Sequence, residues 1–107
     1  MSFYLLQISY NATAIKAMVD HPHDRAEAAR KGIESLGGKM HAFYFTFGPH
    51  DVVVIAEFPD NVSAAATTMA LGASGQFAKA ETTVLMTPAE SMAAMKKTQS
   101  ISFKPPQ

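Results

Sequence analysis

The residues most able to do acid–base chemistry are His50 and Asp51, which are adjacent in the stretch Gly48-Pro49-His50-Asp51. A histidine supported by a carboxylate can transfer a proton near neutral pH. Adjacent residues of a strand point to opposite faces, however, so these two side chains are not expected to meet. The alternative is a turn in which Gly48 takes a positive φ, Pro49 restricts the backbone and Asp51 accepts hydrogen bonds from unpaired amides. We expect the turn role to dominate, with no comparable structural role for His50.

A second group of polar residues is scattered along the chain and would meet on one face of a β-sheet. His41 and His50 are the candidate catalytic bases. Gln7, Glu57 and Lys79 are candidate ligand-binding residues beside His41. Apolar walls with a few polar groups are typical of small-molecule sites. The competing interpretation is that these charged groups, together with Glu81, pair across an interface between subunits.

Several classes of site are disfavoured by what the sequence lacks. It has no cysteine, which excludes disulfides, thiolate catalysis and Cys-ligated zinc. Nine Lys and Arg offset nine Asp and Glu without a basic run, so we expect no nucleic-acid partner. His21 and His23 lie near two aspartates, but they are too few for a structural zinc site and lie at an expected helix N-terminus, which disfavours a cation. Without a phosphate-binding glycine loop or a nucleophile elbow, we expect neither metal nor cofactor.

Hydrophobic periodicity and capping signals predict the elements that position these residues. Asp60 is a predicted N-cap and Thr87 begins a capping box. A helix beginning at Pro22 would end at Gly37 or Gly38, either of which can take the left-handed cap. The predicted elements are strand 3–10, helix 12–19, helix 22–37, strands 39–47 and 51–58, helix 61–72, strand 77–86, and a helix from 88 to about 97.

The order strand, helix, strand, strand, helix, strand predicts an α+β fold of the ferredoxin-like type. Two right-handed βαβ crossovers give a four-stranded antiparallel sheet in the order 4-1-3-2, with helices 22–37 and 61–72 on one face. Only Gly-Pro-His separates the two middle strands, so they should form a hairpin. The 107 residues, 48% hydrophobic and 17% charged, suit a single domain over residues 1–98. Residues 99–107 would be a flexible tail unless a neighbouring subunit holds them.

Strand alternation divides the sheet residues between a side covered by helices and an open side, and a one-residue register shift would exchange the two. A short chain has a thin core, and an exposed apolar face favours packing against a second copy. We therefore expect at least a homodimer through the open face. The residues predicted under the helices are Leu6, Ile8, Val54, Ala56, Val84 and Met86. The predicted apolar stripe of helix 61–72 contains Val62, Ala65, Ala66, Met69 and Ala73. The residues predicted on the open face are Phe3, Leu5, Gln7, Ser9, His41, Phe43, Phe45, Val53, Ile55, Glu57, Lys79, Glu81 and Thr83.

Two longer stretches resemble the GYD domain family over roughly residues 3–95: NATAIKAMVDHPHDRAEAARKGIESLGGKMHAFYFTFGPHDVVVIAEFPD and AAATTMALGASGQFAKAETTVLM. These small bacterial proteins are named for a Gly-x-Tyr-Asp turn between the second and third strands. The resemblance implies a ferredoxin-like fold related to the dimeric α/β-barrel proteins. It implies no reaction, because the role of the family is largely unassigned. Gly48 and Asp51 match the motif, whereas His50 stands where the family has tyrosine.

Two functions stay open on these grounds. One is a small, non-catalytic oligomeric module that binds a metabolite or a protein partner. The other is a cofactor-free enzyme of the dimeric α/β-barrel kind, with His41 or His50 as general base in a cavity on the open face, an idea that rests on analogy of fold. The N-terminal MSFYLLQISY has neither a basic start nor a long apolar run. We therefore expect no membrane span and a cytoplasmic location.

Overall fold

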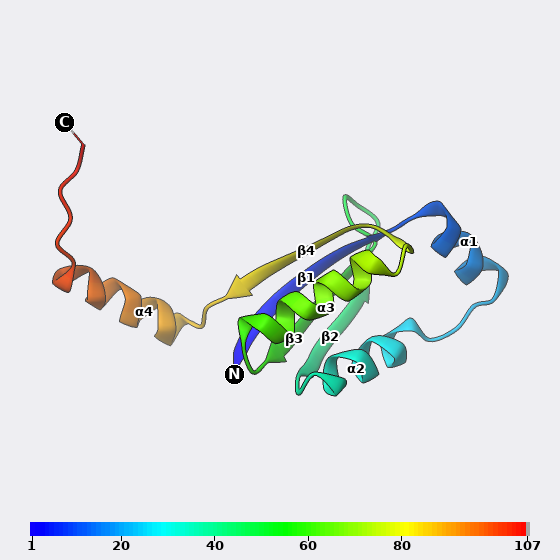
Figure 1. The fold of residues 1–107 in the computed structure, drawn as a ribbon, viewed down its shortest axis with the longest axis horizontal. Helices are drawn as coiled ribbons and strands as arrows, with labels where there is room; N and C mark the ends of the chain where they lie inside the picture. The colour runs from blue at the N-terminus through cyan, green and yellow to red at the C-terminus, as the bar shows by residue number, and fades with distance from the viewer. Residues whose placement is uncertain (107) are drawn as a thin grey trace.

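The chain forms one four-stranded antiparallel sheet with helices packed against it, as the computed structural model of residues 1–106 shows (Figure 1). The strands lie in the order β2-β3-β1-β4, and each neighbouring pair is antiparallel. The predicted α+β fold, the 4-1-3-2 strand order and the hairpin between the middle strands are therefore confirmed. The elements are β1 (Ser2–Tyr10), α1 (Ala12–Asp20), α2 (Arg25–Ser35), β2 (Lys39–Phe45), β3 (Val52–Phe58), α3 (Asn61–Ala73), β4 (Phe77–Leu85), α4 (Pro88–Lys97) and the 3₁₀ turn η1 (Thr98–Ser100).

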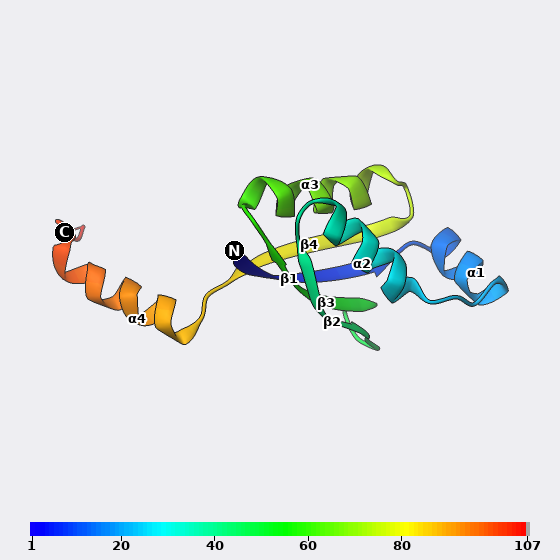
Figure 2. The same ribbon diagram turned by 90° about the horizontal axis from the view of Figure 1, so that it is seen from below.

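Helices α2 and α3 cover the same face of the sheet, as predicted, while α4 projects away from the sheet beyond the end of β4 (Figure 2). The radius of gyration is 17.3 Å, compared with about 13 Å for a compact domain of this length. The projecting C-terminal segment accounts for the elongated shape. Its methionines Met92 and Met95 are exposed, and so are Ile101 and Phe103 beyond η1. Residues 101–106 have no regular secondary structure; their mobility stays a prediction, and residue 107 lies outside the described chain.

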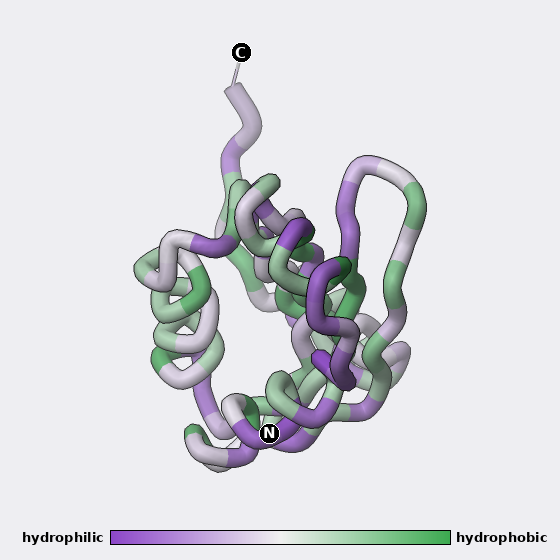
Figure 3. Tube along the Cα trace, turned by 90° about the vertical axis from the view of Figure 1, so that its right-hand side faces the viewer, coloured by the Kyte–Doolittle hydropathy of each residue, from purple (hydrophilic) through white to green (hydrophobic). Residues whose placement is uncertain are grey.

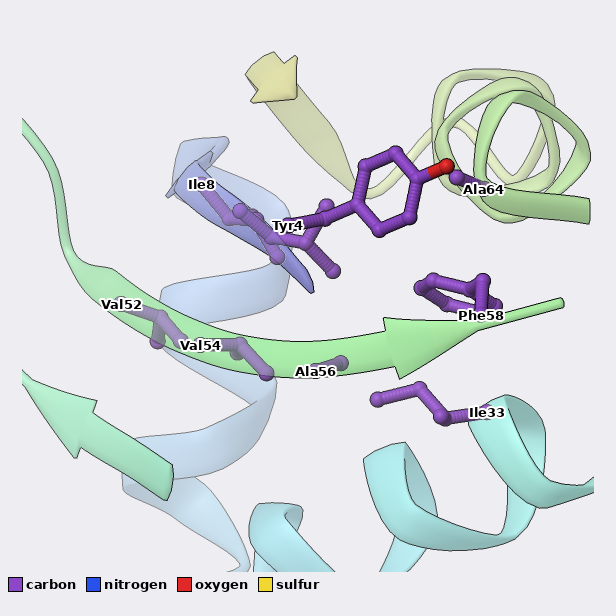
Figure 4. Close-up of a cluster of buried hydrophobic side chains, with 9 residues drawn as sticks. Tyr4, Ile8, Ile33, Val52, Val54, Ala56, Phe58 and Ala64 are labelled. Carbon is purple, nitrogen blue, oxygen red and sulfur yellow. The ribbon is translucent and has the colours of Figure 1, made fainter. Parts of the chain in front are cut away.

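The core forms where alternate residues of β1 and β3 meet the helices (Figure 4). The phenol of Tyr4 points to α3 and donates a hydrogen bond of 2.6 Å to Asn61 Oδ1, which satisfies its buried hydroxyl. Of the residues predicted under the helices, Val84 lies level with Tyr4 but is 55% exposed at the sheet edge, and Met86 lies beyond the end of β4. The buried hydrophobic residues are Tyr4, Leu6, Ile8, Ala14, Ile33, Val52, Val54, Ala56, Phe58 and Ala64.

A β-bulge in β2 overturns part of the predicted face assignment. Met40 pairs with Ala56, but the next pairing joins Ala42 to Ile55, so His41 is the extra residue. A bulge places two residues opposite one and exchanges the faces beyond it. Phe43 therefore packs against the core, and Phe45 follows on the same side. Their predicted place on the open face was wrong, whereas that of His41 is confirmed by its contact with Glu57.

Two helix predictions also need correction. Helix α2 begins at Arg25 rather than Pro22, because Asp24 is its N-cap and accepts the amides of Ala26 and Glu27. In α3 the predicted stripe was wrong: Ala64 is buried, whereas Val62 and Met69 are 77% and 73% exposed. The α3 sequence has no charged residue, and neutral or hydrophobic colours surround the helix in the end-on view of Figure 3. Hydrophobic periodicity could not predict which side of α3 is buried, because no charged face identifies the exposed side.

The connection between β2 and β3 is longer than predicted. It spans residues 46–51 and is closed by a hydrogen bond of 2.8 Å from the Thr46 amide to the Asp51 carbonyl. Gly48 does not have a positive φ, and a Cβ there would meet no atom within 4 Å. Its predicted conformational role was wrong, because a six-residue loop does not require the left-handed residue that a tight turn needs. Gly37, in contrast, has φ 77° after α2, as the predicted cap requires.

Candidate functional site

The uncovered face of the sheet gathers most of the polar groups singled out in the sequence. Along its centre, Leu5 of β1 pairs with Ile55 of β3, and Val53 follows on β3. Leu5, Val53 and Ile55 are half-buried, and Tyr44 beside Val53 is 68% exposed. The face therefore consists of an apolar strip with polar groups towards its ends. Its members are Phe3, Leu5, Gln7 and Ser9 of β1, Lys39, His41, Ala42 and Tyr44 of β2, Val53, Ile55 and Glu57 of β3, and Lys79, Glu81, Thr83 and Leu85 of β4.

One end of the strip contains a histidine–carboxylate pair. His41 Nε2 lies 2.6 Å from Glu57 Oε1, and the imidazole lies against the ring of Phe3 with centroids 5.2 Å apart. The bulge in β2 brings the histidine to this position, because it turns both residues of the bulge towards the open face. The two side chains are 33% and 21% exposed. The pair can hold and exchange a proton at a partly shielded position.

The other end contains a triad of His50, Glu81 and Lys79. Glu81 lies between the other two, with Lys79 Nζ at 2.7 Å and His50 Nε2 at 3.7 Å from its carboxylate oxygens. The hydrogen bond and charge of Lys79, with a smaller contribution from His50, lower the pKa of Glu81. Glu81 is therefore the ionised centre of this group. The His50 side chain is only 15% exposed, and its Nδ1 is buried without a hydrogen-bond partner among residues 1–106.

The two polar groups are too far apart to act on one atom. Glu57 pairs with Phe3 of β1, and Glu81 pairs with Gln7 of the same strand. Four residues of a strand span about 13 Å, and β3 and β4 lie on opposite sides of β1. The predicted convergence of all these residues was therefore wrong within one chain. Gln7 and Lys79 lie with the triad around Glu81, whereas His41 lies with Glu57.

Asp51 has a structural position that fits its predicted turn role. Its carboxylate accepts the amide of Tyr10 at 2.8 Å, and its own amide donates to the carbonyl of Ile8 at 2.8 Å. The amide of Tyr10 lies beyond the last β1–β3 pair, Ile8 with Val52, so the Asp51 side chain supplies an acceptor that the β3 backbone does not. The loop is thus fixed to β1 rather than only closed on itself. His50 and Asp51 engage different partners, as the alternation of strand residues predicts.

Comparison with protein families supplies the classification. The GYD domain model matches residues 4–95, which is most of the chain. The chain belongs to the GYD domain family. No curated protein matches the sequence. In the part of the chain that the structure describes, no helix is long and apolar enough to cross a membrane.

Within this GYD domain, the loop at 46–51 places the His50 side chain beside β4 as well as joining β2 to β3. The His50 ring is largely enclosed beside Glu81, and the expectation that it contributes little to stability stays a prediction. The sequence contained a partial signal for this group: Lys79 and Glu81 are two residues apart on a strand and so share a face. The contact between Glu81 and His50 could not be predicted in this way, because it depends on both the strand order and the geometry of the loop at 46–51. His21 and His23 are exposed, and no cluster of metal-binding side chains occurs among residues 1–106.

Proposed function

We propose that this GYD domain is an oligomeric binding module in which two copies pack through the open sheet face. The observation that carries the proposal is the continuous apolar strip on that face, where Leu5, Val53 and Ile55 are only half-buried within one chain. Complete burial of such a side chain contributes roughly 1.5–3 kcal/mol. About half of that, on the order of 1 kcal/mol each, is still to be gained on assembly.

Charge favours a second copy of the chain as the occupant of this face. The basic side chains on it are Lys39 and Lys79, and the acidic ones are Glu57 and Glu81, so the two signs balance. The whole chain likewise has formal net charge +0 at pH 7. A surface that is apolar in the middle with balanced charges at its margins is self-complementary, which a two-fold interface requires.

Packing of two such faces would also create the binding site. The polar groups lie towards the ends of the strip, so a partner that covers the strip would enclose them without burying them in direct contact. Gln7 and Lys79 at one end, and His41 and Glu57 at the other, then supply donors and acceptors beside apolar walls. This combination suits a small metabolite with both polar and apolar parts.

The test is a change of charge in the middle of the strip. Ile55→Asp should shift the protein from dimer or higher to monomer, because an unpaired carboxylate would have to be desolvated in the interface. Val62→Asp is the matched control, since Val62 is 77% exposed on α3 on the other side of the sheet. Sedimentation velocity at micromolar concentration reads the mass, and circular dichroism verifies that each variant is folded. Wild-type protein that sediments as a monomer at this concentration would contradict the proposal.

A second candidate function, cofactor-free proton-transfer catalysis, is favoured by one specific observation about His50. Its ring is largely enclosed, has an unpartnered Nδ1 among residues 1–106, and lies beside the ionised Glu81. A carboxylate beside one nitrogen of an imidazole ring is an arrangement that general bases use. A metabolite library screened by thermal shift, followed by NMR detection of turnover, separates the two functions. Turnover that is lost in His50→Gln and retained in His41→Gln would establish catalysis; binding without turnover supports the module.

A further inference from the structure

A cavity lies on the helix-covered side of the sheet, between α2, α3 and the strands. It has a volume of about 160 Å³. Its floor includes Ile8, Val52 and Val54, which Figure 4 shows projecting from the sheet towards the helices. The cavity belongs to one chain and shares no residue with the open face. It is therefore independent of the binding module proposed above.

The cavity exists because the inner side of α2 is built from small residues. Ala28, Ala29 and Gly32 line it, and a Cβ placed on Gly32 would meet no atom within 4 Å. On the α3 side the lining residue Thr67 is short, and its hydroxyl already donates to the carbonyl of Ser63 at 3.1 Å. Ala28 and Gly32 are exposed, so the cavity opens to solvent along α2 and a ligand can enter it without displacing side chains.

One positively charged side chain lines this otherwise uncharged cavity. Arg25 is the only charged residue of the lining, and its Nε is buried without a hydrogen-bond partner among residues 1–106. The neighbouring carboxylates are engaged elsewhere: Asp24 caps α2, and Glu27 lies 3.6 Å from Arg30. The guanidinium is 3.3 Å from His23 Nε2 and forms no ion pair within the described chain. A partly buried, unpaired guanidinium offers a forked set of donors that matches a carboxylate.

We propose that this cavity binds a small monocarboxylate with an apolar body of about the size of a benzene ring. The size follows from the volume, since an apolar protein cavity of about 150 Å³ accommodates benzene. The charge follows from Arg25, the only charged residue of the lining, whose guanidinium has no carboxylate partner among residues 1–106. The apolar body then occupies the space next to Gly32, and the carboxylate faces the start of α2.

Benzoate is the probe, and benzyl alcohol is its neutral counterpart of nearly the same shape. Titration of ¹⁵N-labelled full-length protein should shift the amides of α2 and the facing part of α3 when benzoate is added. We expect benzyl alcohol to bind at least about tenfold more weakly, and Arg25→Gln to remove most of that difference. Gly32→Leu should fill the space and abolish binding of both compounds, while raising the melting temperature because it removes a cavity and a helical glycine.

The results that overturn the inference are distinct from failure of the module. Equal binding of the two probes, unchanged benzoate affinity in Arg25→Gln, or absence of benzoate binding up to about 10 mM would each refute it. Shifts confined to the open-face strands would place the site elsewhere and also refute it. Arg25→Gln changes a half-buried polar side chain and is expected to fold, so its result does not depend on tolerance of the larger leucine at position 32. None of these outcomes depends on whether Ile55→Asp dissociates the oligomer.

Discussion

Replacement of Asp51 by alanine should lower the stability of the domain more than any other change in the loop at 46–51. The Asp51 carboxylate accepts the amide of Tyr10 at 2.8 Å, beyond the point where the β1–β3 ladder ends at Ile8 and Val52. A hydrogen bond to a charged group contributes about 1.5–3 kcal/mol, and removal of the acceptor leaves the donor unpaired. Both residues are half-buried rather than enclosed. We therefore expect a loss at the lower end, about 1.5 kcal/mol.

Urea denaturation followed by circular dichroism measures this loss. A small domain loses roughly 1–2 kcal/mol of stability per molar urea, so the midpoint for Asp51→Ala should fall by about 1 M. All variants are compared at one protein concentration, because assembly raises apparent stability. Asp51→Asn retains an acceptor of similar shape and should lose less. Gly48→Ala should change the midpoint little, because that residue has no positive φ and its Cβ would meet open space.

The same series tests the role of His50. The ring contacts Glu81 at 3.7 Å, a distance that contributes little to stability at a partly exposed position. His50→Tyr restores the motif residue of the family and should leave both the midpoint and the mass in solution unchanged. An Asp51→Ala midpoint within about 0.2 M of wild type would refute the structural reading of the carboxylate. A loss in His50→Tyr as large as in Asp51→Ala would show that the histidine, too, stabilises the fold.

Two further predictions follow from particular contacts. Gly38→Ala should destabilise the domain by about 3 kcal/mol in thermal or urea unfolding. The reason is that its Cβ would lie 2.6 Å from the Glu57 carbonyl oxygen and 2.8 Å from Ile33 Cγ2. An unfolding midpoint equal to that of wild type would show that the backbone can move to relieve these contacts. The lowered pKa of Glu81, caused chiefly by Lys79, gives a contribution to stability that is present above the ordinary glutamate pKa and lost as the pH falls through the folded value. Glu81→Gln should therefore show a smaller drop in urea midpoint between about pH 7 and about pH 3 than wild type does, and an identical drop would contradict this linkage.

The order of elements and their pairing could be predicted because each depends on local signals that the sequence states clearly. Asp60 and Thr87 are N-caps in the structure, as predicted, and Thr87 forms the predicted capping box with Glu90. Side-chain alternation in β1 and β3 placed Leu6 and Val54 in the core correctly. These signals act over two to four residues, so neighbouring sequence is enough to read them.

The features that could not be predicted depend on distant parts of the chain or on small differences in polarity between neighbouring residues. The polar triad requires the loop bearing His50 to reach β4, which no local pattern encodes. The buried side of α3 could not be read because residues such as Val62 and Ala64 differ little in polarity from their neighbours. No glycine or proline next to His41 indicates the bulge in the sequence, and its effect appears only as a change of register against β3.

That bulge connects the two sides of the molecule. Without the extra residue, strict alternation from Met40 would place Ala42 and Tyr44 on the helix side and leave Phe43 on the open face. The cavity wall would then lose Phe43, which is the β2 side chain that lines it. The bulge moves this ring into the cavity wall while His41 stays beside Glu57 on the open face. One inserted residue thus lets a single edge strand supply an apolar wall to one proposed site and an acid–base group to the other.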